Sequence, residues 1–314
     1  MNGVGGLIAV QKSKDGTTWS APVPALIQPG TTSFYLSHLS VDASPTSPFA
    51  GAVYVSGVFL PNQGAQVWVS HSNDGGSTWT QVPVDAVQKN PYSDAFTRTA
   101  VGRSGNVYVT WLTGKGNPAP VMMSKSSDGG NTWSTPRQIA TVVTSFLPPY
   151  EERIYDYASV GVDNSSGPHA GNIYVVMYTY TGTYLKVQMI RSTDGGTTWS
   201  EPLGPAPKSD THDQFFPAVS VSKDGLVGVS WLDRRNDPND IDYQAFAAIS
   251  YDGGQTFGPN WQLTTAFSNP KVGNNNWIGD YTGNTWVGDK FIAAWMDSSN
   301  GVDMQEVVSG VQLK

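Results

Sequence analysis

One short motif recurs five times along the chain and constrains the fold more than any other feature. Each copy reads Ser-x-Asp-Gly, then a short turn, then Thr and an aromatic residue. The first copy lacks one residue of the turn, and the last has Phe257 where the others have Trp. The recurrence indicates an internal repeat. The five copies occupy residues 13–19, 72–79, 126–133, 192–199 and 250–257.

The residue types of this motif predict a tight hairpin turn. An aspartate can accept hydrogen bonds from turn amides, glycines tolerate positive φ, and a threonine hydroxyl can close the loop from the other side. The aromatic residue is then expected to pack into a core. The five aspartates are therefore predicted to be structural rather than ligand-binding.

A second period accompanies the first. An apolar strand starts 21 residues before the motif aspartate in three copies, at Val53, Val107 and Ile173, and 25 residues before it in the last copy, at Val227. The longer spacing predicts an extended loop over residues 233–242. Each complete repeat reads as four strands, a to d, with the motif between c and d, as in 214–222, 226–232, 243–249 and 260–264. Four repeats cover residues 33–86, 91–142, 150–207 and 212–265.

This motif resembles the Asp box of the sialidase (neuraminidase)-like, BNR-repeat family. The resemblance implies an all-β protein, a β-propeller of four-stranded blades, with the boxes on the face away from the active site. The family normally has six blades, whereas five blade equivalents can be counted here. Residues 1–30 supply strands c and d, and residues 275–314 supply a, b and a further strand. We expect one domain over residues 1–314. Whether residues 304–313 begin a sixth blade or an N-terminal half-blade is missing stays open.

Composition limits the partners. The formal charge is −7, 14% of residues are charged, and no basic cluster exceeds the Arg234–Arg235 pair, which disfavours nucleic acid and anionic membranes. A neutral or sugar-like ligand fits better. There are no cysteines, no apolar run long enough to span a bilayer, and no visible signal peptide. With the resemblance, this predicts a secreted, extracellular bacterial protein, monomeric and without membrane insertion.

The resemblance also implies where chemistry occurs. Sialidases place a site at one end of the propeller channel, formed by the d–a and b–c loops. Three arginines bind the substrate carboxylate, a Tyr activated by a Glu is the nucleophile, and an Asp is the acid/base catalyst. Tyr281 matches the nucleophile by blade position, but a channel-filling core aromatic is the alternative. The remaining candidates, for which ion pairs or a capped turn are the alternative, are Glu152, Arg153, Arg234, Arg235 and Asp213.

The chain departs from the family at its first triad arginine. The family carries that arginine in a Phe/Tyr-Arg-Ile-Pro motif before the first Asp box, and only twelve residues precede Ser13 here. The nearest string, Arg153-Ile-Tyr, lies in a different blade. If the chain is complete, orthodox sialidase catalysis is therefore not expected.

No cofactor is expected to be required. Binding of a Ca²⁺ ion by the acidic loop at residues 233–242 stays open, because Asp237, Asp240 and Asp242 offer clustered oxygen ligands. The loop is not an EF-hand. A solvated loop balanced by two arginines is the alternative. The four histidines are scattered, which disfavours zinc.

Two functions from different classes follow. The first is a secreted, sialidase-like enzyme acting on glycans or glycoconjugates, an exo-glycoside hydrolase of the exo-α-sialidase type. The second is a non-catalytic propeller that binds carbohydrate or protein, using Trp277, Tyr281, Phe34 and Tyr155 as stacking platforms.

Overall fold

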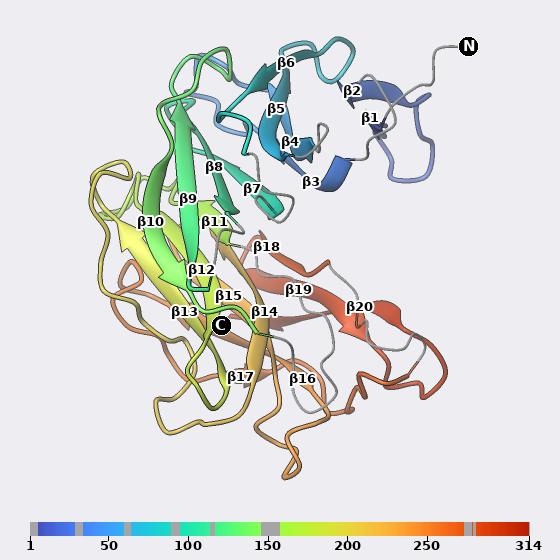
Figure 1. Ribbon diagram of the computed structural model, residues 1–314, viewed down its shortest axis with the longest axis vertical. Coiled ribbons are helices and arrows are strands. Elements are labelled where there is room, and N and C mark those ends of the chain that lie inside the picture. Colours follow the sequence, from blue (N-terminus) through green and yellow to red (C-terminus); the bar gives the residue numbers. More distant parts are fainter. Residues whose placement is uncertain are drawn as a thin grey trace. The chain divides into compact units, whose positions relative to one another are not determined.

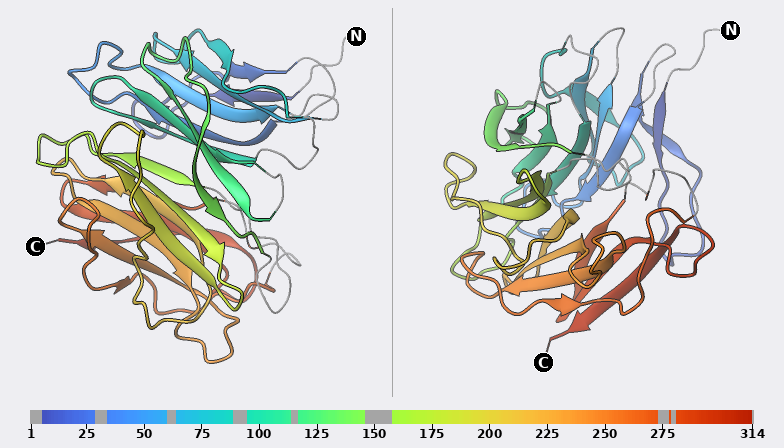
Figure 2. Two further views of the ribbon diagram at one scale, coloured as in Figure 1. Left: turned by 60° about the vertical axis from the view of Figure 1, so that its left-hand side comes forward. Right: turned by 60° about the horizontal axis from the view of Figure 1, so that its bottom comes forward.

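A computed structural model describes residues 6–28, 34–59, 64–88, 95–113, 117–145, 158–272, 278 and 281–313. The described strands form six antiparallel sheets, each made of strands that follow one another in sequence. The chain divides into two compact units, residues 1–141 and 142–314. Figure 1 labels the strands, and Figure 2 shows the chain from two further directions.

The first unit contains three sheets. A two-stranded sheet is followed by two four-stranded sheets, the last of which ends one residue beyond the unit boundary. Their strands are β1 (Leu7–Val10) and β2 (Val23–Ile27); β3 (Phe34–Val41), β4 (Val53–Phe59), β5 (Gln66–Ser72) and β6 (Thr80–Pro83); and β7 (Ala95–Val101), β8 (Val107–Leu112), β9 (Ala119–Ser126) and β10 (Arg137–Val142).

The second unit also contains three sheets. A four-stranded sheet stands between two three-stranded ones in sequence order. Their strands are β11 (Ser159–Val162), β12 (Ile173–Tyr180) and β13 (Leu185–Ser192); β14 (Gln214–Val221), β15 (Val227–Asp233), β16 (Gln244–Ser250) and β17 (Trp261–Gln262); and β18 (Gly283–Val287), β19 (Lys290–Asp297) and β20 (Gln305–Gln312).

The predicted repeat is confirmed in the complete sheets. Strands b and c, expected at 226–232 and 243–249, are observed as β15 and β16, each displaced by one residue. Residues 305–312 pair with β19 as the third strand of the last sheet, while β1 and β2 pair with each other. The described strands thus form six sheets, one more than the five blade equivalents, because each chain end contributes a sheet of its own.

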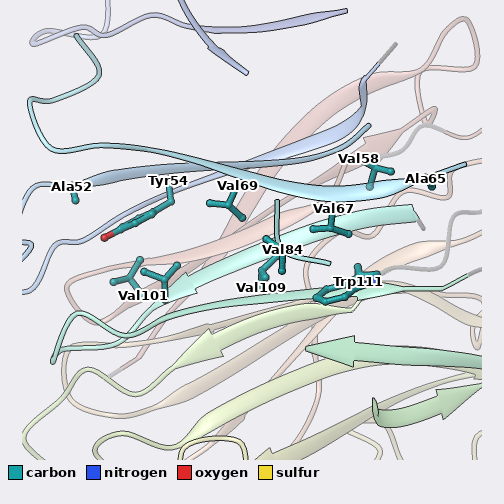
Figure 3. Close-up of a cluster of buried hydrophobic side chains, with 11 residues drawn as sticks. Ala52, Tyr54, Val58, Ala65, Val67, Val69, Val84, Val101, Val109 and Trp111 are labelled. Atoms are coloured by element: carbon teal, nitrogen blue, oxygen red, sulfur yellow. The ribbon is translucent and has the colours of Figure 1, made fainter. Parts of the chain in front are cut away.

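Buried apolar side chains fill the space between neighbouring sheets. Figure 3 shows this for the first unit, where valines of β5 and β8 meet Tyr54 and Trp111. In the strands of these sheets, alternate side chains point to opposite faces, so a valine-rich strand can pack on both. Strand β8 is buried along its whole length. This packing, rather than local propensity, stabilises the stack of sheets.

The Asp boxes have the predicted internal hydrogen bonds. In the box between β16 and β17, Ser250 Oγ donates to Asp252 Oδ1 (2.8 Å) and Thr256 Oγ1 to Asp252 Oδ2 (2.6 Å). Gly253 and Gly254 take φ values of 69° and 76°, which a residue with Cβ adopts only with strain. These amide and hydroxyl donors lower the pKa of Asp252 to about 2, against the opposing effect of burial. The turn is therefore built around an ionised carboxylate.

The box aromatic residues differ in burial. Trp79, Trp133 and Trp199 are partly buried, as the sequence predicted, whereas Trp19 in the shortened first box is 58% exposed. The expectation of a core-packed aromatic is therefore wrong for that copy. The β1–β2 sheet has only two strands, so it offers less apolar surface for the indole to cover.

Basic side chains connect one box to the next within each unit. Lys12, just before the first box, donates from Nζ to the carbonyl of Gly75 in the second (3.1 Å). Arg191 makes the equivalent contact from Nη1 to the carbonyl of Gly253 (3.2 Å). Two neighbouring hairpins, which belong to different sheets, are thus joined by a hydrogen bond from a side chain to a backbone carbonyl.

Candidate functional site

The inner strands of the last two sheets lie side by side in parallel. Thr282 and Asn284, on or next to β18, donate to the carbonyls of Phe216 (3.2 Å) and Ala218 (2.7 Å) on β14. Because the partners keep the same offset, the starts of β14 and β18 lie at one end of this unit. Tyr281 stands level with the first half of β14. The b–c loop of residues 234–243 comes to the same end, which we call the loop end.

Arg234 is fully buried at the loop end and forms an ion pair with Asp213. Its Nη1 lies 3.2 Å from Asp213 Oδ2 and donates to the carbonyl of Asp240 at 2.9 Å. The side chains of Arg234 and Asp213 are 0% and 2% exposed. The sequence analysis offered an ion pair at the surface as the alternative for Arg234. The structure has the ion pair, but it is buried. Arg234 joins the b–c loop to the start of β14.

Asp213 is held from several sides. Its Oδ1 accepts the backbone N–H of Leu185 (2.7 Å), and its own N–H donates to Asp240 Oδ1 (3.2 Å). Burial raises the pKa of Asp213 to about 6, while the Leu185 amide and Arg234 act in the opposite direction. A carboxyl group with such a pKa can exchange a proton near neutral pH. Both of its oxygens, however, already accept internal donors.

Arg235 forms a second group of ion pairs, with two other aspartates, next to the Arg234–Asp213 pair. Its guanidinium pairs with Asp233 Oδ2 and lies 3.2 Å from Asp210 Oδ2. The guanidinium carbon stacks over the Phe246 ring, 4.4 Å from its centroid. Burial raises the pKa of Asp233, and Arg235 opposes that shift. Planar stacking and a paired carboxylate fix this arginine in place.

Tyr281 differs from these groups because half of its surface, 51%, is exposed. The alternative of a core aromatic is therefore not what the structure shows. His212 lies at the same end, 34% exposed, with its Nδ1 3.0 Å from Asp210 Oδ1. Its backbone N–H also donates to that oxygen (3.1 Å), so the turn before β14 is capped by Asp210.

Several predicted site residues lie outside the described residues. Glu152 and Arg153 are among them, as are Tyr155 and Trp277, and nothing follows for their roles. The structure brings Arg234, Arg235 and Asp213 to the loop end, where Arg234 pairs with Asp213 and Arg235 pairs separately with Asp233 and Asp210. Their catalytic roles, and that of Tyr281, stay predictions.

The acidic loop holds its carboxylates with its own backbone. Asp237 accepts the N–H groups of Asn239 (3.0 Å) and Asp242 (2.7 Å), and these bonds lower its pKa. Asp242 accepts the side chain amide of Asn269 (2.8 Å). Within the described part of the chain, no three His, Asp or Glu side chains are grouped to hold a metal ion. A calcium ion bound through Asp237, Asp240 and Asp242 stays a prediction.

Sequence reasoning missed a second repeat at the loop end. Strand β15 ends Trp231-Leu-Asp233 and strand β19 ends Trp295-Met-Asp297. In both, the indole Nε1 donates to Asp Oδ2, at 2.7 and 3.4 Å. The Trp-x-Asp spacing at the end of these two strands was the available signal. Asp210, which binds both His212 and Arg235, had no comparable pattern around it.

The six sheets and the Asp boxes define a β-propeller of the sialidase type, and comparison with solved structures confirms this fold. A protein of unknown function from Dyadobacter fermentans is similar over 100% of this chain and 86% of its own, with TM-score 0.59 and 17% identity. The NanB sialidase from Streptococcus pneumoniae matches 98% of the chain, with TM-score 0.59 and 12% identity. An α-L-arabinofuranosidase from Fusarium graminearum matches 98% of this chain and 86% of its own, with TM-score 0.56 and 14% identity.

These likenesses extend to the fold alone. The chain spans 63% of the length of the NanB sialidase. Comparison with protein-family models and with curated protein sequences finds no match. Among the described residues, no helix has the length and apolar character needed to cross a membrane.

Proposed function

We propose that this protein is an exo-acting glycoside hydrolase that works outside the cell on neutral terminal sugars. The observation that carries the proposal is the contrast at the loop end between an exposed Tyr281 and two arginines already bound by the chain's own carboxylates. The fold supports it, because the NanB sialidase and the Fusarium arabinofuranosidase share it. A fold alone does not define an activity, which depends on the groups at the site.

The bound arginines bear on the choice of sugar. A sialic acid carries a carboxylate, which arginine binds through paired charged hydrogen bonds. Arg234 and Arg235 would have to give up Asp213 and Asp233 to offer such a contact, and this would leave buried carboxylates without a counter-charge. A neutral sugar requires no such exchange, and it suits the chain's net charge of −7.

In the proposed reaction, Tyr281 is the nucleophile of a retaining mechanism. Its hydroxyl oxygen attacks the anomeric carbon and passes its proton to a carboxylate, for which Glu152 is the sequence candidate. The glycosidic bond breaks as a carboxylic acid protonates the leaving oxygen. Water then cleaves the glycosyl–tyrosine bond and restores both groups. Arg234 and Asp213 act in this scheme as positioning residues that fix the loop end.

The proposal is tested with a panel of aryl glycosides, including an α-L-arabinofuranoside, several neutral pyranosides and a sialoside. Turnover of a neutral glycoside is expected, with Tyr281→Phe lowering kcat by about a hundredfold or more. Tyr174→Phe is the control, because it also removes one tyrosine hydroxyl, but from the box-proximal part of β12 in a different sheet. Equal rates for wild type and Tyr281→Phe would exclude the nucleophilic role.

A non-catalytic carbohydrate-binding propeller is the second candidate. It is favoured by the internal pairing at the loop end, where both oxygens of Asp213 accept bonds from the chain itself. Glycan binding without turnover of any aryl glycoside would establish this candidate and exclude the first.

A further inference from the structure

A groove lies at the other end of the second unit, which we call the box end. Its volume is about 440 Å³, and its lining includes Leu226, Tyr251, Trp261, Asp289 and Gln312. Small-ligand sites have volumes of about 300 to 1,000 Å³, so the groove is large enough for one. It lies between the sheet β14–β17 and the sheet β18–β20.

The strand register places this groove far from Tyr281. Val227 pairs with Ser250 at the box end of the first sheet, and Lys290 pairs with Gln312 at the same end of the second. Tyr281 precedes β18, whose last residue, Val287, pairs with Lys290 across the turn. Six residues of extended chain span roughly 20 Å. A ligand in the groove therefore does not touch the loop end.

The groove combines aromatic surface with polar groups. Tyr251 is 61% exposed, an unusual degree of exposure for a large aromatic residue, and Trp261 is partly buried beside it in the groove lining. Asp289 and Gln312 are exposed and add a carboxylate and an amide. The backbone N–H of Leu313 donates to the carbonyl of Asp289 (3.1 Å), which holds the β18–β19 turn against the end of β20. This bond fixes the backbone segments that carry Asp289 and Gln312 relative to each other.

We propose that this groove is a second, non-catalytic binding site for a neutral oligosaccharide. Sugar rings present an apolar C–H face, which can stack on Tyr251 and Trp261, and hydroxyl groups, which can hydrogen-bond to Asp289 and Gln312. Asp289 and the net charge of −7 oppose an anionic ligand. The site does not depend on whether the loop end is catalytic. It would hold a glycan chain on the protein independently of turnover.

The test measures binding of the intact chain to an array of neutral oligosaccharides built from glucose, mannose, galactose, xylose or arabinose. We expect at least one to bind, and Tyr251→Ala and Trp261→Ala each to weaken that binding tenfold or more. Trp19→Ala is the matched control, because Trp19 is an equally exposed aromatic residue in the other unit. Thermal unfolding checks that each variant is folded, and Tyr251→Phe should retain most of the affinity.

Two results would overturn the proposal. They are an array without any bound neutral sugar, and an affinity unchanged in the Tyr251→Ala and Trp261→Ala double variant. Aryl glycoside turnover is measured in parallel on the same variants. Loss of turnover with Tyr281→Phe but retained array binding would separate the two ends.

Discussion

The two ends of the second unit differ in how regular their turns are. At the box end, the turn after β13 and the turn between β16 and β17 repeat the same contacts, with Ser donating to Asp Oδ1 at 2.8 Å and Thr to Asp Oδ2 at 2.6 Å in both. At the loop end, the b–c connection runs from residue 181 to 184 in one sheet and from 234 to 243 in the next. The repeated turns at the box end therefore stabilise the scaffold, whereas the b–c loops, which differ from sheet to sheet, carry the groups available for chemistry.

The largest effect is expected from breaking the buried pair at the loop end. Arg234→Met leaves Asp213 buried without its counter-charge, which costs about 3–5 kcal/mol of unfolding free energy. Urea unfolding followed by tryptophan fluorescence measures this loss. The double variant Arg234→Met with Asp213→Leu should recover part of it. A loss below about 1 kcal/mol would show that the loop end does not depend on this pair.

A smaller loss is expected at the box end. Asp252→Ala removes the acceptor of Ser250, Thr256 and the Gln255 amide, and should cost about 1–3 kcal/mol in the same urea experiment. Thr256→Val, which removes one of these donors, should cost less. If Asp252→Ala proved more damaging than Arg234→Met, the order of the two ends would be reversed.

The two ends should also respond to pH in opposite directions. The pKa of Asp213 is raised to about 6 in the folded state, so the folded protein binds more protons than the unfolded chain between about pH 4 and 6. This contribution is complete below the unfolded pKa and is lost as pH rises through 6. Lowering the pH from 7 to 5 should thus stabilise the wild type by about 1 kcal/mol relative to Asp213→Asn.

Asp252 provides the matching measurement. Its folded pKa is lowered to about 2, so its contribution is present above the unfolded pKa near 4 and is lost as pH falls through 2. Unfolding of wild type and Asp252→Asn should differ at neutral pH and converge in strong acid. An unchanged difference at low pH would mean that the box does not require the ionised carboxylate.

The smallest effect on stability is expected for Tyr281→Phe. The side chain is 51% exposed, and substitutions at such positions usually change the unfolding free energy by less than about 0.5 kcal/mol. The same urea measurement checks this. A large destabilisation would mean that Tyr281 belongs to the scaffold, and any loss of turnover in the variant would then need another explanation.

The sequence predicted the scaffold well because its signals are local. Strands β15 and β16 lie within one residue of their predicted bounds, and each box closes on residues at most four apart. The loop end was harder, since Arg234 finds Asp213 21 residues earlier in the chain. Local reasoning gave Arg234 a surface position, whereas the register of β14 against β15 buries it. Phe216, buried with φ of 49°, likewise has a conformation that no propensity predicts.

The hydrogen bonds that connect one hairpin to the next bear on how the sheets separate under force. Lys12 is tied to Gly75, and Arg191 to Gly253, so adjacent sheets of a unit share a bond outside their ladders. In arrays where each element touches mainly its neighbours, rupture spreads from one element to the adjacent one. Under a stretching force, each pair so tied should separate at a higher force than packing alone would give, and Arg191→Ala should lower that force.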